Sequence, residues 1–333
     1  MSEQRRLGTD GPIVSAIGMG TWALGGPTSA GDQPVGWGRD YDKRQAADVL
    51  SASFDAGITL FDTADAYGCG TSERLIGETL GSHRDEIAIV SKWGNLIDED
   101  TRQIVGTDAS PAYIRTALDA SLRRLRTSHL DLYLLHLSGL PVAEAQEMLG
   151  TLQDLVTEGK IRAYGWSTDE PELAAAWTCQ PGFGAIEFEV NVVRDAPELV
   201  AICDERNLPG LCRGPLGTGL LSGKYGVGSQ IEDTEDFRRV SPEWLNYFQN
   251  GRPVERYADR LRAVSDILTA RGRTTAQGAL CWLLARSPNL IPIPGARTVE
   301  QARANAAAIE HGPLTEEEMG AVHDALASPP QRP

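Results

Sequence analysis

Residues 60–80 read LFDTADAYGCGTSERLIGETL and combine a short apolar run, a polar turn and an amphipathic segment. Leu60-Phe61-Asp62 is typical of a buried strand. A helix is predicted to open at Ser72, with an inner face formed by Leu75, Ile76 and Leu80. A strand followed by a helix that packs on it is the repeating unit of parallel α/β folds. This segment therefore predicts an α/β protein.

The same alternation of apolar runs and amphipathic stretches continues along the chain and favours parallel strands with helical crossovers. One helix opens at Ser110-Pro111, a good cap and first turn, with inward positions at Ile114, Leu118, Leu122 and Leu125. Eight strands close a (β/α)8 TIM barrel of about 250 residues, so we expect one domain over residues 1–333. The predicted strands are Ala16–Gly20, Leu60–Asp62, Ile87–Lys92, Leu130–His136, Ile161–Ser167, Ala185–Val190, Leu211–Arg213 and Leu290–Pro294.

Three extensions account for the residues beyond a plain barrel. Arg5 to Val14, with Gly8-Thr9-Asp10-Gly11 at its centre, predicts an N-terminal β-hairpin that caps the barrel bottom. Gly214 to Pro253 is too long for an ordinary connection and is a candidate functional loop. Thr315 to Ala327 predicts an extra C-terminal helix.

Composition excludes several classes of function. The 333 residues include 31 Lys and Arg against 46 Asp and Glu, a formal charge of −15, which disfavours nucleic acid as the main partner. The longest clean apolar run, Ala279 to Ala285, is too short for a membrane span, and Met1 to Arg6 precede no apolar segment, so no signal peptide is expected. Five scattered cysteines favour a reduced, cytoplasmic protein without a metal site. A hydrophilic exterior favours a monomer.

Two short motifs resemble nucleotide-binding sequences but lack their context. Gly18 to Ala23 fits the pattern G-x-G-x-x-A, yet Leu24-Gly25-Gly26-Pro27 cannot start the helix that a Rossmann site needs. Gly219 to Tyr225 has three residues between its glycines where a P-loop has four, and Tyr follows its Lys. A Rossmann-type oxidoreductase and a nucleotide triphosphatase are both disfavoured.

Four residues with complementary chemistry follow three consecutive predicted strands: Asp62, Tyr67, Lys92 and His136, here called the tetrad. The carboxyl ends of barrel strands converge on one face, where catalysis is found. Singly, each has an ordinary structural explanation as a rim ion pair, a packed aromatic or a core imidazole, but their joint placement favours a site. An ammonium about 4 Å from the phenol would lower the pKa of Tyr67 by about three. The set suits protonation of an oxygen while hydride from a nicotinamide attacks the carbon.

The chain resembles the aldo-keto reductase superfamily essentially end to end. The matching motifs are Gly18 to Trp22, Asp62 to Gly68, Ser91-Lys92, Ser121 to Leu125 before Asp131-Leu132-Tyr133, His136, Gly165 to Thr168, Pro215-Leu216 with Gly219 to Lys224, and Pro294-Gly295 followed by Gln301 and Asn305. The resemblance implies NADPH-dependent reduction of aldehydes or ketones. Tyr67 would be the proton donor, with Asp62, Lys92 and His136 completing the tetrad.

The resemblance also implies the cofactor and substrate contacts. Arg297 favours NADPH over NADH, because a guanidinium matches a 2′-phosphate in bidentate fashion. Trp22, Tyr67, Trp93 and His136 would surround a small carbonyl substrate, whether aldehyde, ketone or keto-sugar. The implied cofactor-binding residues are Gly20, Thr21, Trp22, Asp62, Ser167, Thr168, Glu187, Arg213, Leu216, Thr218, Lys224, Gly295, Arg297, Gln301 and Asn305.

Three positions depart from the family pattern. Thr168 stands where Asn is usual, Glu187 where Gln is usual, and Arg213 where many members stack an aromatic on the nicotinamide. An ionised Glu187 would favour the positively charged oxidised nicotinamide over the reduced form; a protonated Glu187 would not. A cofactor-binding regulatory protein, like the channel β subunits that share this fold, is the alternative to an enzyme.

Overall fold

A parallel barrel of eight strands forms the centre of the computed structural model, which describes residues 3–8, 11–38, 41–226, 228–233, 236–242 and 244–327. The strand order is β16-β13-β12-β11-β10-β7-β6-β3, and all ladders between these neighbours are parallel. Every strand overlaps one of the eight predicted runs. The strands are β3 (Met19–Gly20), β6 (Leu60–Asp62), β7 (Ala88–Trp93), β10 (Leu132–Leu135), β11 (Tyr164–Ser167), β12 (Phe183–Glu189), β13 (Gly210–Arg213) and β16 (Leu290–Pro292).

The barrel closes between its first and last strands through backbone contacts. Gly18 N donates to Pro292 O at 2.9 Å, Gly20 N donates to Pro294 O at 3.2 Å, and Gly20 forms a parallel bridge with Gly295. A Cβ at Gly20 would lie 2.7 Å from Ile293 O, so glycine permits this approach. Gly18-Met19-Gly20 is therefore a barrel seam. A short 3-10 turn, η1 (Trp22–Leu24), follows where a Rossmann site would begin an α-helix.

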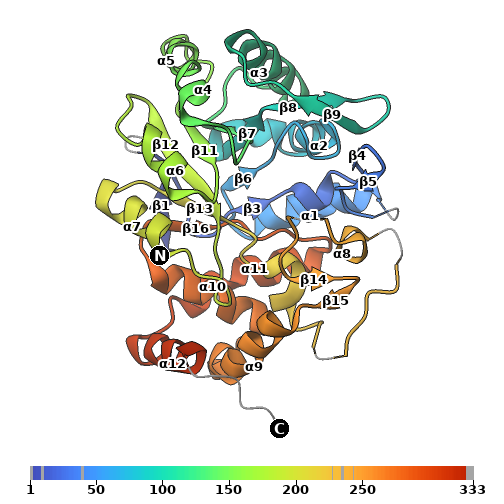
Figure 1. Cartoon of the computed structure of the whole chain (residues 1–333), viewed down its shortest axis with the longest axis vertical. Coiled ribbons are helices and arrows are strands. Elements are labelled where there is room, and N and C mark those ends of the chain that lie inside the picture. The colour runs from blue at the N-terminus through green and yellow to red at the C-terminus, as the bar shows by residue number, and fades with distance from the viewer. Residues whose placement is uncertain are drawn as a thin grey trace.

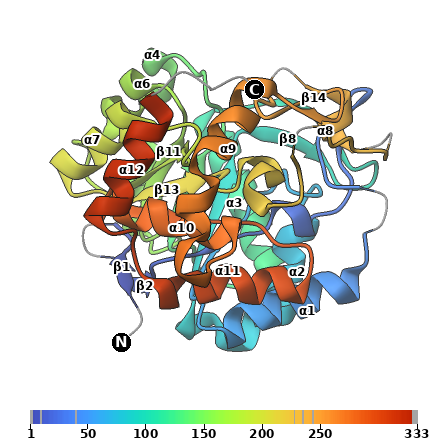
Figure 2. The same cartoon turned by 90° about the horizontal axis from the view of Figure 1, so that it is seen from below.

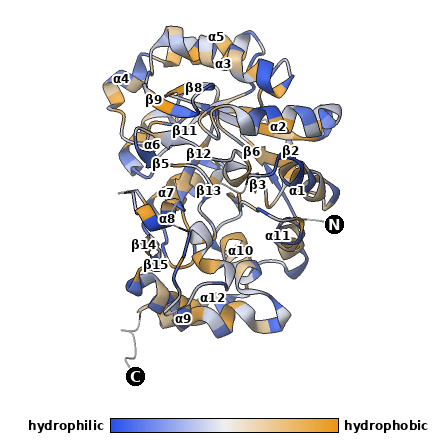
Figure 3. Cartoon of the chain, turned by 90° about the vertical axis from the view of Figure 1, so that its right-hand side faces the viewer, coloured by the Kyte–Doolittle hydropathy of each residue, from blue (hydrophilic) through white to orange (hydrophobic). Residues whose placement is uncertain are grey.

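Helices surround the barrel (Figure 1), and α1, α2 and α11 lie side by side in Figure 2. Along outer helices such as α2 and α9, Figure 3 shows hydrophobic and hydrophilic residues alternating, as expected for helices with one buried face. The helices are α1 (Lys43–Asp55), α2 (Thr71–Leu80), α3 (Pro111–Leu125), α4 (Val142–Gln146), α5 (Leu149–Thr157), α6 (Pro171–Trp177), α7 (Pro197–Arg206), α8 (Phe237–Val240), α9 (Glu255–Thr269), α10 (Thr275–Arg286), α11 (Val299–His311) and α12 (Glu316–Ala327).

Local sequence signals account for several helix boundaries. Ser110 caps α3, because its side chain accepts a hydrogen bond from Tyr113 N at 3.2 Å, and Pro111 occupies the first turn. Thr274 and Gln277 form a capping box at the start of α10. Helix α2 begins at Thr71, one residue before the predicted position. None of the helices in the described part of the chain is long and apolar enough to cross a membrane.

The apolar core has two layers. One cluster fills the barrel and includes Leu60, Val90, Leu134 and Leu211, whose side chains point inward. The larger cluster lies between the strands and the helices and contains Phe61, Ile89 and Tyr133 from the alternate strand positions. The two clusters together fix which strand residues face the barrel mouth and which face the helices.

The predicted N-terminal hairpin is confirmed as β1 (Gln4–Arg6) paired antiparallel with β2 (Ile13–Ser15). Leu7 and Val14 join the cluster inside the barrel, so the hairpin caps its bottom. Thr9 and Asp10 of the predicted turn lie outside the described residues. The C-terminal helix is confirmed as α12, which packs on α9.

The sequence did not predict the small sheets at the barrel mouth. Strands β4 (Ser29–Ala30), β5 (Gln33–Pro34), β8 (Asn95–Asp98) and β9 (Gln103–Thr107) form a four-stranded sheet in the order β5-β4-β9-β8. The long loop after β13 contains the turn η3 (Gly217–Ser222), α8, and the hairpin β14 (Phe248–Gln249) with β15 (Arg252–Pro253). Of these strands, β4, β5, β14 and β15 have two residues each, too few for alternation to be recognised in a sequence.

Gly68 supplies a test of how tightly the turn after β6 is packed. Its φ is +63° and an added Cβ would lie 1.9 Å from Gly25 O, so Gly68→Ala should lower the free energy of unfolding by at least about 1 kcal/mol in urea titrations. Gly320→Ala is the matched control, since Gly320 lies in α12 with open space around it. The free energy of unfolding of the control variant should rise by up to about 1 kcal/mol. Equal midpoints for the two variants would contradict the prediction.

Candidate active site

The tetrad comes together at the carboxyl ends of β6, β7 and β10. Asp62 ends β6, Lys92 lies in β7, His136 follows β10, and Tyr67 lies in the turn after β6. Lys92 Nζ lies 2.5 Å from Asp62 Oδ1 and 3.3 Å from Tyr67 Oη, and it also donates to Thr63 O at 2.9 Å. The rings of Tyr67 and His136 are 6.0 Å apart, edge to face. The sequence-based placement of these four side chains in one site therefore agrees with the geometry.

An unusual turn presents Tyr67 to this site. Gly68, Cys69 and Gly70 all have positive φ values, of +63°, +46° and +83°. The turn is held by Gly70 N donating to Asp65 O at 2.7 Å and by the start of α2. The left-handed conformation costs about 1–2 kcal/mol for a residue such as Cys69, and packing around the turn must offset that cost.

A buried polar network supports the turn from below and was missed in the sequence. Arg124 Nε donates to Glu73 Oε2 at 2.6 Å, and Ser91 Oγ donates to Glu73 Oε1 at 2.5 Å. Glu73 is completely buried in the first turn of α2, beside the equally buried Asp65. A glutamate at an inward helix position was the available sequence signal. This network joins α2, α3 and β7 beneath Tyr67.

The pKa of Tyr67 contradicts the prediction that Lys92 makes the phenol acidic. Burial raises the pKa of Tyr67 by more than Lys92 lowers it, and Asp62 and Glu187 raise it further. The main physical reason is that the phenol is removed from water, which disfavours the phenolate; the Asp62 and Glu187 carboxyls near Lys92 add to this effect. At neutral pH Tyr67 therefore keeps its proton, as a proton donor must.

Lys92 is charged at neutral pH, whereas His136 is neutral. Burial lowers the pKa of Lys92, but Asp62 and Glu187 more than offset this, so the amine stays charged. Burial and the positive charge of Lys92 lower the pKa of His136 to about 3, so the imidazole is neutral. Asn95 Nδ2 lies 3.5 Å from His136 Nδ1, a neighbour that the sequence did not suggest. A neutral imidazole can donate a hydrogen bond to a substrate oxygen.

Glu187 lies closer to the tetrad than the sequence suggested. Its side chain is 1 % exposed, Ser167 Oγ donates to its Oε1 at 2.9 Å, and its Oε2 is 3.4 Å from Lys92 Nζ. Oε2 is buried and has no hydrogen-bond partner within the described residues. The buried Lys92 therefore faces two carboxyl groups, those of Asp62 and Glu187.

The other two departures from the family pattern have partners within the protein. Thr168 Oγ1 donates to Ser138 O at 2.8 Å and accepts from Glu170 N at 3.2 Å. Asp169 holds the guanidinium of Arg213 through an ion pair. The hydroxyl of Thr168 is thus already engaged, and the orientation of Arg213 is set by Asp169.

The residues expected at the adenosine end lie together at the start of α11. Gln301 Oε1 accepts from Arg297 N at 2.8 Å, and Asn305 Nδ2 donates to Gly295 O at 3.3 Å. These two side chains shape the backbone that meets the barrel seam at Gly20. The guanidinium of Arg297 is exposed and lies 5.6 Å from the Trp37 ring.

The residues expected near the pyrophosphate lie in and beside η3. Leu216 precedes the turn, and Thr218 has a positive φ of +50° within it. Thr218 O accepts a hydrogen bond from the buried Arg238 at 3.2 Å, while Lys224 is exposed just after the turn. The sequence did not reveal that Arg238 is fixed in place by Asp236.

Aromatic rings form one wall of the barrel mouth. Trp22 contacts Trp37, Phe237 and Trp244, with ring centroids 5.5, 5.0 and 5.9 Å away. Trp93, expected in the substrate pocket, is instead fully buried against Tyr133 at 4.5 Å. Side chains alternate along a strand, so Trp93 points to the helix layer when its neighbour Lys92 points to the mouth.

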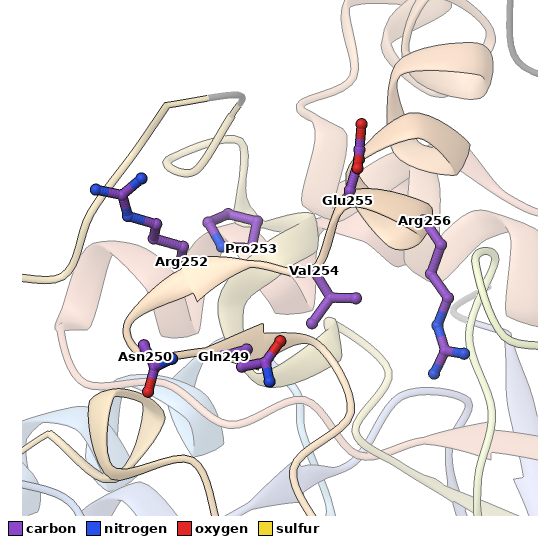
Figure 4. A pocket seen from close by; sticks show the side chains of 7 residues that line it. All are labelled: Gln249, Asn250, Arg252, Pro253, Val254, Glu255 and Arg256. Carbon is purple, nitrogen blue, oxygen red and sulfur yellow. The ribbon is translucent and has the colours of Figure 1, made fainter.

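A surface hollow beside β14 and β15 is not part of this site. Figure 4 shows that the side chains of Arg252 and Arg256 at its two ends do not point toward each other. The hollow is lined only by residues of segment 249–256, and it contains none of the tetrad. We therefore assign no function to it.

A family model and the sequences of related proteins indicate the same protein family. A family model described as "Aldo/keto reductase family" matches residues 16–327. "Aldo-keto reductase yakc [NADP(+)]" of Schizosaccharomyces pombe is 31% identical over 319 residues, which cover 92% of this chain and 86% of that protein. An uncharacterized oxidoreductase of Mycobacterium tuberculosis is 32% identical over 301 residues, which cover 89% of this chain and 85% of the relative.

Solved structures are similar over the whole chain. Aldo-keto reductase AKR11C1 from Bacillus halodurans, in its holo form, has a TM-score of 0.77 and 28% identity, and the match covers 99% of each chain. Glycerol dehydrogenase AKR11B4 from Gluconobacter oxydans has a TM-score of 0.79 and 28% identity, and the match covers 98% of this chain and 95% of that one. An aldo-keto reductase from Klebsiella pneumoniae in complex with NADPH has a TM-score of 0.70 and 28% identity, and the match covers 100% of this chain and 97% of that one.

The low pKa of His136 predicts a defined pH dependence of stability. The ordinary value is 6.5, and the folded value is about 3. Below pH 6.5 the unfolded chain therefore binds a proton that the folded protein does not bind. Stability contributed by neutral His136 is complete above pH 6.5. It falls by up to about 1.4 kcal/mol for each pH unit below that value until about pH 3.

Urea unfolding between pH 7 and pH 4 measures this effect. We expect His136→Gln to flatten the fall in unfolding free energy with decreasing pH. The exposed His323 on α12 provides a matched control, and His323→Gln should leave the slope as in the wild type. Parallel curves for the wild type and His136→Gln would show that the imidazole is charged in the folded protein.

Proposed function

The chain belongs to the aldo/keto reductase family, and from this premise we propose that it reduces an aldehyde or ketone to an alcohol, using NADPH and with Tyr67 as the proton donor. One observation carries the proposal: Tyr67 Oη lies 3.3 Å from the charged Lys92 Nζ at the carboxyl end of the barrel, and it keeps its proton at neutral pH. The names of the yeast relative and of the Klebsiella structure support the choice of cofactor for this chain.

The residues at the barrel mouth fit a dinucleotide phosphate. Among the residues that the structure describes, buried Glu187 Oε2 has no hydrogen-bond partner, as expected of an acceptor that awaits a carboxamide N–H. At the other end, the exposed Arg297 and the start of α11 suit a phosphate group. We assign the nicotinamide end to Ser167 and Glu187.

Each residue of the tetrad has a different role in the proposed reduction. The cofactor, when bound, supplies the hydride to the carbonyl carbon. Tyr67 gives its hydroxyl proton to the carbonyl oxygen, and the adjacent Lys92 ammonium stabilises the phenolate that remains. Asp62 holds Lys92 in place at 2.5 Å, and together with Glu187 it keeps the amine charged. The neutral imidazole of His136 donates a hydrogen bond that orients the carbonyl oxygen.

The wall around the tetrad indicates a small carbonyl compound. Trp22 offers an aromatic surface, and the rings of Trp37, Phe237 and Trp244 hold it from behind. Aldehydes, ketones and keto-sugars all fit an apolar wall opposite a hydrogen-bonding imidazole. We expect the substrate to be selected by shape along this wall.

Replacement of the proton donor is the direct test. Tyr67→Phe should lower turnover by about 10²- to 10⁴-fold, because only the hydroxyl is lost. NADPH consumption across a panel of aromatic aldehydes, ketones and keto-sugars measures the effect, and NADPH binding should persist. A wild-type protein that binds NADPH but turns over no member of the panel would instead favour a cofactor-binding regulatory protein.

Arg297 tests the assignment of the 2′-phosphate. Arg297→Ala should weaken NADPH binding by about 10- to 100-fold, the loss expected for a charge-assisted hydrogen bond, and should change NADH binding little. Arg303→Ala is the matched control, because Arg303 is also exposed on α11. Fluorescence titration with each cofactor gives the dissociation constants. An equal loss of affinity for NADPH and for NADH would refute the assignment of Arg297 to the 2′-phosphate.

A further inference from the structure

Two carboxyl groups and one ammonium form a buried cluster at the barrel mouth. Lys92 is 0 % exposed, Glu187 1 % and Asp62 2 %. Lys92 Nζ lies 2.5 Å from Asp62 Oδ1 and 3.4 Å from Glu187 Oε2. If both carboxyls were ionised, this water-poor cluster would carry an uncompensated negative charge, which is costly to bury.

The closeness of the two carboxyls to one amine also favours a shared proton. Asp62 and Glu187 both approach the single amine of Lys92, through Oδ1 at 2.5 Å and Oε2 at 3.4 Å, so two ionised carboxylates there would repel each other. Ionised carboxylates only accept hydrogen bonds, so a bond between them exists only when one of them is protonated. Two neighbouring carboxyls commonly share a single proton for this reason. The pair with its proton and the charged Lys92 together make a neutral cluster.

We propose that the carboxyl pair Asp62–Glu187 shares one proton in the free protein and releases it when the oxidised cofactor binds. The inference rests on the proposed function, which puts the nicotinamide beside Glu187. The oxidised ring is positively charged and attracts an ionised Glu187, whereas the reduced ring is neutral and does not. The exchange balances: the oxidised cofactor enters with its positive ring charge, and one proton leaves to solvent.

The other charged or titratable groups that face the pair do not change state near neutral pH. Burial raises the pKa of Tyr67, and the two carboxylates raise the pKa of Lys92. Burial lowers the pKa of His136 to about 3, and the guanidinium of Arg213 is always charged. Within the pair, burial and Glu187 raise the pKa of Asp62, against the effect of Lys92. Glu187 has its pKa lowered by Lys92 and His136, although burial opposes this.

The pair therefore makes cofactor preference depend on pH. Raising the pH removes the shared proton from the free protein before the cofactor binds. The affinity for NADP⁺ should therefore rise by up to about tenfold per pH unit until the pair is ionised. The affinity for NADPH should change little over the same range. Glu187 thus raises the fraction of bound cofactor that is in the oxidised form as the medium becomes alkaline.

Calorimetric titration of the full chain with NADP⁺ and with NADPH tests this inference. Measurements in phosphate and in Tris between pH 6 and 8 give the number of protons released, from the dependence of the heat on the buffer. We expect release of up to about one proton with NADP⁺ and distinctly fewer with NADPH. Glu187→Gln should abolish the difference. Glu189→Gln, the matched control on the same strand with a carboxylate that pairs with Arg194, should retain it.

The outcomes separate this inference from the function on which it rests. Binding of both cofactors with equal proton release by the wild type would overturn the inference and leave the proposed function standing. The same follows if Glu187→Gln binds both cofactors and keeps the wild-type difference. Failure of the wild type to bind either cofactor would contradict the proposed function, and this inference with it. The wild-type measurement decides the matter alone if Glu187→Gln does not fold.

Discussion

The arrangement at the barrel mouth depends on one buried cation, Lys92, and on the carboxylates that keep it charged. An ammonium without exposure to solvent would lose its proton unless opposite charge were close, and the carboxyl pair of Asp62 and Glu187, 2.5 and 3.4 Å from the amine, supplies that charge. Burial keeps the proton on Tyr67, burial and the charge of Lys92 keep His136 neutral, and Glu187 lies 3.4 Å from the amine. The barrel contributes by bringing the ends of β6, β7 and β10 within reach of one amine.

The supporting backbone explains why these side chains hold their positions. Tyr67 projects from a turn whose glycines adopt conformations that other residues avoid, and the Glu73–Arg124 ion pair fixes the helix that follows. On the opposite side of the mouth, Gln301 and Asn305 hold the loop that joins the last strand to α11. Tyr67 thus comes from an irregular turn that lies between a strand and a helix, whereas Asp62 and Lys92 lie in the strands themselves.

The sequence predicted the barrel and the residues of the tetrad because strand alternation and the polar residues after each strand are visible in one dimension. It did not reveal the direction of the shift in the pKa of Tyr67, since this depends on how far each group is removed from water. Trp93 was assigned to the wrong face because its closeness to Lys92 in sequence was given more weight than the alternation of side chains. The two-residue strands of the mouth, such as β4, carry too few residues for any pattern.

The aromatic cluster at the mouth links parts of the chain that are distant in sequence. Trp22 and Trp37 come from the segment after β3, whereas Phe237 and Trp244 come from the loop after β13. Neither segment has a complete packing surface without the other. Chimeras that transplant one of these segments from a relative would leave unmatched rings at the junction, so any exchange designed to alter selectivity has to carry both segments together.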